Sequence, residues 1–334
     1  MIKKIGIGIL ALFVFVIVFY FWGSAPAHLS DEYQETIEIT DFNAPEPKDT
    51  LSIVTFNVGY LSGMTNNRAV DRNIDLFRNH FQQSLKVLKS ISPDFIAFQE
   101  IDFKSDRSYQ IDQLAEYQFE MRFPIAAKAV NWDKTYVPFP YWPVSQQFGA
   151  IYSGQAVLSN YPVIGMDVIP LVKPQDNPFY YNAFYLDRLI QVAKIKVGKI
   201  EMVLINLHLE AFHANTRDAQ IKTVLAEVHK YVENHPVLLV GDFNSTPPGA
   251  SFPYQDDHVI ETLLSDFQLE MAIGMEENKN NESANFTFPS DSADRRLDYI
   301  FYNPKFVQII EARVVHESRQ VSDHLPVYMK FALR

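Results

Sequence analysis

The sequence predicts an α/β fold with a mixed β-sheet arrangement, and three observations carry that prediction. Apolar runs rich in Val, Ile, Leu and Phe recur from about residue 51 to residue 331, which is typical of buried strands. Between them, residues 71–90 and 221–232 place apolar side chains at three- and four-residue spacing, typical of helices lying on a sheet. Some runs end on a polar residue and others begin with one, which favours strands of both directions.

The chain opens with a candidate membrane-spanning segment. Residues 1–4 contain two lysines, and residues 5–22 contain only apolar residues, glycine and one tyrosine; this stretch approaches the length of a bilayer span. Acidic residues follow between positions 31 and 38. Basic residues before the span and acidic residues after it predict a short cytoplasmic N-terminus, a signal anchor and an extracytoplasmic C-terminal domain. We therefore expect a single-pass membrane protein.

The alternative for this segment is a cleaved signal peptide. Ala25-Pro26-Ala27 offers small residues for cleavage, but the central proline and the long apolar stretch favour an uncleaved anchor. Residues 23–48 are polar and contain prolines without a periodic pattern, which predicts a linker. Residues 49–334 are long enough for one large domain with a sizeable core. The absence of cysteine excludes a disulfide framework.

Six strand-like runs carry a polar residue or pair at one end. Four of them end on Asn57 (LSIVTFN), Glu100 (DFIAFQE), His208 (MVLINLH) and Asp242 with Asn244 (VLLVGDFN), whereas two begin with Asp298 (LDYIFYN) or with Asp323 and His324 (SDHLPVYMKF). If strands of opposite direction lie in one mixed sheet, these ends share an edge. All six groups then converge on one site.

The residue types at that edge indicate a particular chemistry. They are carboxylates, amides and two histidines, without cysteine and without a glycine-rich phosphate loop. Hard oxygen ligands suit Mg²⁺, Mn²⁺ or Ca²⁺ better than zinc. This set favours metal-assisted phosphoester chemistry, with Mg²⁺ as the expected cofactor and Mn²⁺ or Ca²⁺ as alternatives.

Each residue also has an ordinary structural interpretation when it is considered alone. An isolated Asp or Asn after a strand is commonly a turn or helix-cap residue. Asp298 follows Arg295 and Arg296 and could form a surface ion pair with them, and His208 could be a hydrogen-bonded histidine beneath a loop. The shared position at strand ends favours the functional interpretation for the set as a whole.

Seven ordered motifs carry a resemblance to a known family. The motifs are TFNVGYL, AFQEID, GQAVLSNYPV, NLHLEAF, VGDFNSTP, RRLDYIF and SDHLPVYMKF. In this order the sequence closely resembles the endonuclease/exonuclease/phosphatase superfamily, whose members share the deoxyribonuclease I-like fold. The resemblance spans nearly all of the chain after the linker. It implies a four-layer α/β/β/α sandwich, with two packed mixed β-sheets and outer helices.

The resemblance also implies a role for each motif residue around the metal and the water. Glu100 corresponds to the principal metal ligand, Asn57 lies beside it, and Asp323 is a further carboxylate on the metal side. Asp242 corresponds to the residue that orients or deprotonates the attacking water. Asn244 corresponds to the amide that helps to hold the water and the phosphate.

The remaining motif residues are implied to contact the phosphate. His324 corresponds to the histidine at the scissile phosphate, and Asp298 to the carboxylate that orients it; a paired carboxylate is expected to raise the pKa of His324. His208 corresponds to a second phosphate-contacting histidine of the nuclease and sphingomyelinase branches. Arg188 lies where many members place a phosphate-binding arginine, in a looser alignment that leaves its role open.

Charge and aromatic content bear on the substrate. The chain has 29 Lys and Arg against 40 Asp and Glu, a formal net charge of −11, and it lacks a basic cluster interleaved with aromatics, so nucleic acid is the less favoured substrate. Residues 131–154 and 174–181 are rich in aromatics and proline. Such loops contact a membrane interface or stack on a ligand, or alternatively fill a hydrophobic gap.

Together these features predict a membrane-anchored phosphodiesterase that cleaves a phospholipid or sphingomyelin-like substrate. The expected partners are a membrane lipid or another phosphodiester, and the bilayer through the N-terminal helix; no protein partner is predicted. The alternatives are an exported nuclease with the same chemistry and a catalytically silent envelope binding module. The sequence leaves open whether a phosphodiester or a phosphomonoester is preferred.

Overall fold

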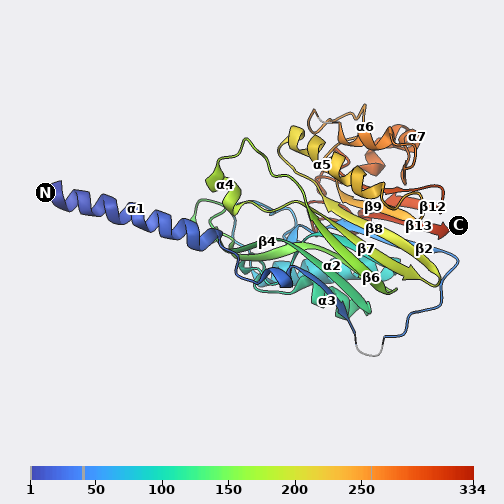
Figure 1. Ribbon diagram of the computed structural model, residues 1–334, viewed down its shortest axis with the longest axis horizontal. Helices are drawn as coiled ribbons and strands as arrows, with labels where there is room; N and C mark the ends of the chain where they lie inside the picture. The colour runs from blue at the N-terminus through green and yellow to red at the C-terminus, as the bar shows by residue number, and fades with distance from the viewer. Residues whose placement is uncertain (1, 40–41, 257) are drawn as a thin grey trace.

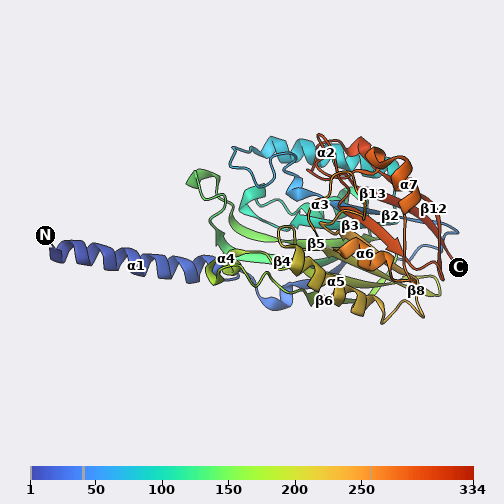
Figure 2. The same cartoon turned by 90° about the horizontal axis from the view of Figure 1, so that it is seen from above.

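Two β-sheets pack face to face at the centre of the computed structural model, which describes residues 2–39, 42–256 and 258–334 (Figures 1 and 2). The seven-stranded sheet has the order β1 (Gln34–Glu38), β4 (Ile125–Val137), β5 (Gly149–Ser159), β3 (Phe95–Asp102), β2 (Leu51–Asn57), β13 (Val327–Leu333) and β12 (Val307–Val314). The six-stranded sheet has the order β10 (Glu270–Met271), β11 (Asp298–Tyr302), β9 (Val237–Asp242), β8 (Ile200–His208), β7 (Leu189–Val197) and β6 (Val163–Pro170). Each sheet contains parallel and antiparallel pairs, such as parallel β2–β3 and antiparallel β3–β5. The predicted sandwich of two mixed sheets is confirmed.

Helices cover the two outer faces of the sheets, on opposite sides of the molecule (Figures 1 and 2). The seven-stranded sheet packs against α2 (Ile74–Ile91) and α3 (Gln113–Met121), and the six-stranded sheet against α5 (Ala214–Val228) and α6 (Val259–Leu264). Two further short helices are α4 (Phe179–Phe184) and α7 (Met275–Asn280). Short 3-10 turns lie at Ser30–Glu32, Gly59–Leu61, Asp106–Ser108, Val144–Gln146, Glu282–Asn285 and His316–Ser318.

The continuous apolar runs of the sequence are explained by burial on both faces of the strands. In β2, Leu51 and Ile53 belong to the core between the two sheets, whereas Val54 and Phe56 belong to the core beneath α2 and α3. Side chains alternate between the two faces of a strand, so a strand buried on both faces is apolar at nearly every position. The same alternation holds in the other strands that end at the site.

The N-terminal helix α1 (Ile2–Ser24) extends away from the sandwich, at the end of the molecule opposite to the C-terminus (Figure 1). Its segment Lys3–Ser24 contains an 18-residue window with a mean hydropathy of 2.7 and is long and apolar enough to cross a membrane; a signal sequence has the same properties. It is the one such helix in the ranges that the structure describes.

The segment expected as an irregular linker contains a strand. β1 pairs antiparallel with β4, from Gln34 opposite Ala129 to Glu38 opposite Ile125, and forms the edge of the seven-stranded sheet. All five β1 side chains are exposed. Because backbone hydrogen bonds hold β1 in place and no side chain of it is buried, the sequence has no apolar pattern to reveal it.

Candidate active site

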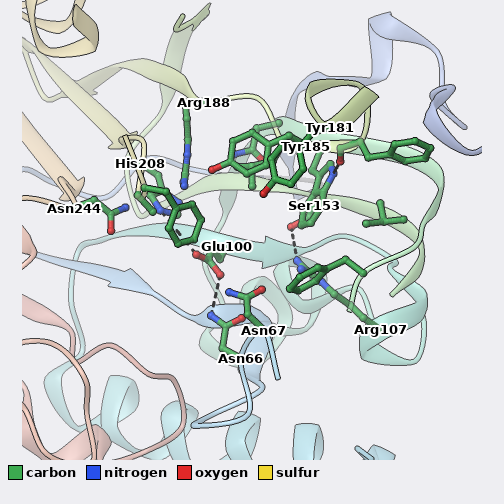
Figure 3. Close-up of a pocket in the computed structure, with 18 of the residues that line it drawn as sticks. Asn66, Asn67, Glu100, Arg107, Ser153, Tyr181, Tyr185, Arg188, His208 and Asn244 are labelled. Carbon is green, nitrogen blue, oxygen red and sulfur yellow. Dashed lines mark hydrogen bonds and ion pairs between the residues drawn. The ribbon is translucent and has the colours of Figure 1, made fainter. Parts of the chain in front are cut away.

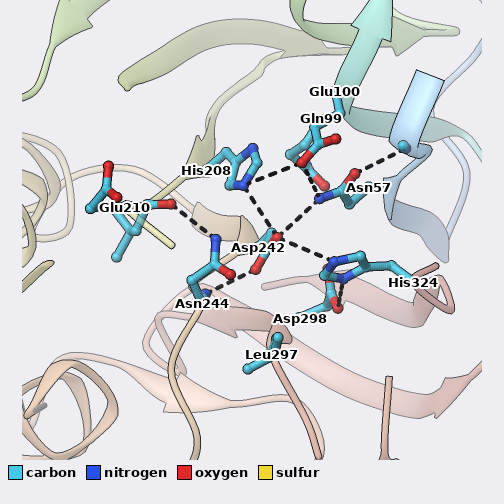
Figure 4. Close-up of polar contacts among 12 residues, drawn as sticks. Asn57, Gln99, Glu100, His208, Glu210, Asp242, Asn244, Leu297, Asp298 and His324 are labelled. Carbon is cyan, nitrogen blue, oxygen red and sulfur yellow. Dashed lines mark hydrogen bonds and ion pairs between the residues drawn. The ribbon is translucent and has the colours of Figure 1, made fainter. Parts of the chain in front are cut away.

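The polar strand ends predicted from the sequence meet at one side of the sandwich, and both sheets contribute to the meeting point (Figure 4). Asn57 ends β2, Glu100 lies near the end of β3, His208 ends β8, Asp242 ends β9, Asp298 begins β11, and Asp323 with His324 lies in the loop before β13. We predicted that these strand ends would meet at the edge of one mixed sheet. In the structure the strands belong to two facing sheets. In the six-stranded sheet, Asp242 pairs with His208 on one side and with Asp298 on the other.

Close approach of the backbones of β8 and β9 holds two of these strand ends together. Gly241 has a φ of +140°, and a Cβ atom at this position would lie 1.9 Å from the carbonyl oxygen of Leu207. Only glycine fits such a contact. The glycine therefore allows His208 and Asp242, the next residue of each strand, to lie side by side.

The Asp242 carboxylate lies at the centre of a buried hydrogen-bond network (Figure 4). Its Oδ2 accepts a hydrogen bond from Asn57 Nδ2 at 3.0 Å and lies 3.3 Å from His208 Nε2 and 3.7 Å from His324 Nε2. Its Oδ1 accepts a hydrogen bond from the backbone N–H of Asn244 at 2.9 Å. Four side chains or backbone groups from separate parts of the chain are thus arranged around one carboxylate.

Asp242 and His324 have shifted proton affinities. Burial raises the pKa of Asp242 to about 7, with a further increase from Asp298 and an opposing decrease from His324. Burial lowers the pKa of His324, but the charges of Asp298 and Asp242 outweigh it and raise this pKa well above 6.5. His324 Nδ1 donates to Asp298 Oδ2 at 2.9 Å. This imidazole is therefore cationic near neutral pH, as expected for a histidine paired with a carboxylate.

The second histidine behaves in the opposite way. Burial, together with the positive charges of Arg188 and His324, lowers the pKa of His208 well below its usual value. His208 is therefore a neutral imidazole that can donate one hydrogen bond and accept another. The site combines one cationic and one neutral histidine around the same Asp242 oxygen.

A pair of carboxylates lies beside this network. Asn66 Nδ2 donates to Asp323 Oδ2 at 3.0 Å and to Glu100 Oε2 at 3.3 Å. Asn57 Nδ2 lies 3.4 Å from Glu100 Oε1. Burial raises the pKa of Asp323 to about 6, against the effect of His324 and with an additional increase from Glu100. Two carboxylates that share one amide donor supply the hard oxygen atoms that Mg²⁺ prefers, so the residues fit a divalent cation.

A different group of potential ligands, Asp242, Asp298 and His324, has donor atoms within 4.8 Å of one another. His324 is cationic and donates to Asp298. A protonated imidazole has no free lone pair for a metal. This triad is therefore a hydrogen-bonded network, and Glu100 with Asp323 is the better pair of ligands.

Glu100 and Asn244 adopt backbone conformations that are uncommon for residues other than glycine. Glu100 has a φ of +50°, and the pairing of β3 with β5 shifts register between Phe98 and Ile101. Such a bulge redirects the side chain at its centre. Asn244 has a φ of +48°, and its Nδ2 donates to the carbonyl oxygen of Leu209 at 3.0 Å. Both conformations lie at the site, where backbone strain commonly serves function.

Arg188 precedes β7 and lies near His208 in the wall of the site (Figure 3). Its side chain is buried, and its Nε lies 3.8 Å from Glu210 Oε2, which accepts a hydrogen bond from the Tyr185 hydroxyl at 3.1 Å. Among the described residues, Arg188 Nε and Nη1 have no hydrogen-bond partner. These free donors are suited to phosphate oxygens.

Two residues of the site were missed from the sequence. Asn66 lies in the loop after β2, and its hydrogen bond to Asp323 joins residues 257 positions apart. Glu210 follows His208 by two positions and is fully buried against Arg188. Asn66 has no sequence signal because it lies outside the strand ends. Glu210 had a weak signal, as an acidic residue within NLHLEAF.

Most of the site residues line a cavity of about 720 Å³, namely Asn66, Glu100, Arg188, His208, Asp242, Asn244, Asp323 and His324. Glu100 and His208 lie at the polar end of this cavity, and Tyr181 and Tyr185 continue the wall away from it (Figure 3). Asp242 and His324 belong to the polar end through the contact of Asp242 with His208 and with His324. Residues of the two segments predicted as aromatic loops, 131–154 and 174–181, line the same cavity. The loop prediction was wrong for part of them, because residues 131–137 belong to β4, residues 149–154 to β5 and residues 179–181 to α4. A phosphate group at the polar end would lie beside an apolar wall.

Comparisons with known proteins agree with this architecture. The model of the endonuclease/exonuclease/phosphatase family matches residues 54–324. One similar solved structure is an endonuclease/exonuclease/phosphatase from Beutenbergia cavernae, with 20% identity and a TM-score of 0.61 over 86% of this chain and 72% of that chain. A mannosyl-6-phosphatase from Bacteroides thetaiotaomicron has 15% identity and a TM-score of 0.57 over 84% of this chain and 99% of that chain. The human Nocturnin catalytic domain has 16% identity and a TM-score of 0.56 over 92% of this chain and 100% of that chain. No curated protein matches the chain.

At these identities the solved structures support the fold, and the family model supports the relationship. The members of this superfamily act as metal-dependent phosphoesterases. The motifs, the sandwich and the match over residues 54–324 lead to one conclusion. The chain belongs to the endonuclease/exonuclease/phosphatase family.

Proposed function

We propose that this protein is a membrane-anchored, metal-dependent phosphodiesterase that hydrolyses a phospholipid or a sphingomyelin-like lipid. The observation that carries the proposal is the cavity of about 720 Å³, which joins Glu100, Asp242 and His324 to an aromatic wall. The polar end suits a phosphate diester, and the aromatic wall suits an apolar substituent on that phosphate. The net charge of −11 disfavours a polyanionic nucleic acid.

In this proposal Glu100 and Asp323 hold the cation, with Asn57 beside them, and Mg²⁺ is the expected ion. When bound, the cation neutralises phosphate charge and acidifies water. Asn66 donates to both carboxylates at 3.3 and 3.0 Å and therefore orients them. Residues that orient metal ligands typically contribute to metal affinity.

Asp242 accepts a proton from the attacking water, and Asn244 helps to hold this water in place. The water oxygen forms a new bond to phosphorus, the bond from phosphorus to the leaving alkoxide breaks, and the alkoxide takes a proton from solvent. Cationic His324 and the free Arg188 donors neutralise the charge that develops on the non-bridging oxygens. His208, which is neutral, donates a hydrogen bond to the phosphate without adding a charge.

The topology belongs to the same proposal. Helix α1 spans the membrane with residues 1–4 in the cytoplasm, and the sandwich lies on the extracytoplasmic side. The length of α1 and the mean hydropathy of 2.7 over an 18-residue window of it support this arrangement. Protease protection in intact and opened cells tests it: the sandwich should be accessible to protease without opening of the membrane that α1 spans.

A direct test compares four substrates with the purified full chain in detergent micelles with Mg²⁺. The substrates are sphingomyelin, phosphatidylinositol, supercoiled plasmid and a phosphomonoester, and a matched reaction contains EDTA. We expect hydrolysis of lipid that EDTA abolishes and that added Mg²⁺ restores. Plasmid cleavage with untouched lipid would replace this proposal with an exported nuclease, and inactivity on all four would favour a silent binding module.

A further inference from the structure

The last turns of α1 pack against the catalytic sandwich. The Phe19 ring stacks on Phe184 with centroids 6.3 Å apart, and the Tyr20 ring meets Phe184 edge-on at 6.0 Å. Phe19 also meets Tyr136 of β4 at 5.9 Å. A Cβ atom on buried Gly23 would lie 3.1 Å from both Phe184 and the carbonyl oxygen of Tyr136. The helix end therefore lies in direct contact with α4 and β4.

Polar contacts just after α1 fix its direction. The backbone N–H of Thr135 donates to the carbonyl oxygen of Ala25 at 2.8 Å. The buried carboxylate of Asp133 accepts hydrogen bonds from the backbone N–H groups of Ala27 at 3.0 Å and His28 at 2.9 Å. The chain that leaves α1 is thus hydrogen-bonded to β4 directly after the helix end.

The end of α1 forms part of the cavity that contains the active site. Val16, Phe19 and Tyr20 line the cavity at one end, and Glu100, Asp242 and His324 line it at the other. Tyr181 and Tyr185 line the same cavity, apart from Glu100 and His208 (Figure 3). One continuous cavity therefore joins the candidate membrane helix to the polar site.

We propose that the last turns of α1 are one wall of the substrate site, and that they hold an alkyl chain of a lipid phosphoester that enters from the surrounding bilayer. This inference rests on the proposed function, because it requires a phosphate diester at the polar end. The residues at the α1 end offer apolar and aromatic surface, which suits methylene groups and gives a sugar hydroxyl little to bind.

The position of this wall favours an alkyl chain over a nucleobase. Aromatic residues can stack on a base, but Val16 lies two turns inside a helix whose exposed surface is apolar on all sides, as at Leu12 and Phe15. In a bilayer such a surface is surrounded by lipid chains. An alkyl chain reaches Val16 without leaving the apolar phase, whereas a nucleotide would have to be dehydrated.

Two synthetic diesters with the same leaving group test the inference. The probes are 4-nitrophenyl hexadecyl phosphate and 4-nitrophenyl methyl phosphate, both assayed with the full chain in detergent micelles with Mg²⁺. Hydrolysis of either releases 4-nitrophenolate, so the ratio of the two kcat/KM values isolates the contribution of the alkyl chain. We expect the wild-type ratio to favour the hexadecyl ester by at least about tenfold.

Removal of one ring from the wall should reduce that ratio. Phe19→Ala should lower the preference for the hexadecyl ester by about three- to tenfold. Phe13→Ala is the matched control, because Phe13 lies on the same helix, is 61% exposed and does not line the cavity. It should keep the wild-type ratio. Partial unfolding would lower both activities of a variant together and leave the ratio unchanged.

The outcomes separate the inference from the proposed function. Equal kcat/KM for the two esters in the wild type would overturn the role of α1 and leave the phosphodiesterase intact. An unchanged ratio in Phe19→Ala, or an equal fall in Phe13→Ala, would also overturn it. If the wild type cleaves neither ester, the proposed phosphodiesterase activity is wrong and the role of α1 falls with it.

Discussion

The two ends of the cavity are built in different ways. At the polar end, Asp242, Asp298 and His324 are almost fully buried, and strand ends from both sheets hold them in a hydrogen-bonded network. At the apolar end, the wall comes from the end of α1, the six-residue helix α4, a loop and residues of β4, with Phe179 75% and Trp142 77% exposed nearby. The polar end is therefore fixed by the sheets, whereas the apolar end depends on individual side chains at the surface.

This difference separates chemistry from substrate choice. A group at the polar end has several partners, so one substitution disturbs charges and hydrogen bonds together. A ring at the apolar end contributes mainly contact area, so its loss has a graded effect. Substitutions at the polar end should lower turnover of every substrate to a similar degree, and substitutions at the apolar end should change the preference among substrates.

The largest effect is expected from Asp242→Asn and from His324→Ala. The first removes the proton acceptor and the second removes the cation beside the phosphate, so turnover of the methyl ester should fall by on the order of 10³-fold or more. The assay measures 4-nitrophenolate release. Thermal unfolding followed by circular dichroism is the control for the fold. Near-normal turnover in either variant would reject this site.

The fall in turnover should be smaller in Asn57→Ala, because the amide supports Asp242 and Glu100 without reacting.

The second effect concerns pH and tests whether Asp298 acts through His324. The negative charge of Asp298 raises the pKa of His324, so Asp298→Asn should lower it. The cationic imidazole is then lost at a lower pH, and the alkaline limb of the kcat/KM profile should move to lower pH by about one unit or more. A fall in rate without movement of that limb would mean that Asp298 has a structural role only.

The ion pair of Asp298 and His324 also gives a prediction for the free energy of unfolding. The pKa of His324 is higher in the folded chain than its ordinary value of 6.5, so its contribution to the free energy of unfolding is complete below about pH 6.5 and is lost as pH rises through the folded-state pKa. The free energy of unfolding of Asp298→Asn should therefore be reduced more at pH 6 than at pH 10. Urea unfolding at both pH values, in EDTA, measures this difference.

A smaller effect is expected from Asn66→Ala. Because Asn66 donates to both Glu100 and Asp323, its loss should raise the Mg²⁺ concentration for half-maximal activity by about 10- to 100-fold. Saturating Mg²⁺ should restore most of the rate. Asn79→Ala, an exposed amide on α2, is the control and should require the wild-type Mg²⁺ concentration. An unchanged Mg²⁺ requirement in Asn66→Ala would separate this residue from the metal site.

The smallest effect is expected at Trp142, which lies outside the cavity wall. Trp142→Ser should raise the KM for a lipid substrate in vesicles by a few-fold, because an exposed indole favours the membrane interface. The KM for the soluble methyl ester should rise less than the KM for the lipid substrate in vesicles. A larger effect on the methyl ester would place Trp142 in the site and weaken the contrast between the two ends.

The sequence predicted the polar end well because its residues are attached to strands. Asn57, Glu100, His208 and Asp242 follow apolar runs that are buried on both faces, and such runs are visible in a single sequence. Asn66 could not be found in this way, since it lies in a loop and acquires its role by contact with Asp323. The apolar pattern of a single strand also does not show which sheet the strand joins. The strands could therefore not be assigned to two facing sheets from their sequences.

The N-terminal region was harder to predict for a related reason. β1 is held by backbone pairing with all its side chains exposed, and the contacts of Asp133 with Ala27 and His28 join segments about one hundred positions apart. Neither leaves a local pattern. An apolar run showed that residues 5–22 form a helix, but only the folded chain shows that this helix ends against α4.

The bonding of Asp133 to the chain just after α1 limits how far the catalytic centre can travel. If α1 crosses the bilayer, the centre stays at a nearly constant height above one leaflet and moves only by lateral diffusion of the whole molecule. The relevant reactant concentration is then the number of molecules per unit of membrane area, and dilution of the vesicle suspension should leave the rate per enzyme unchanged.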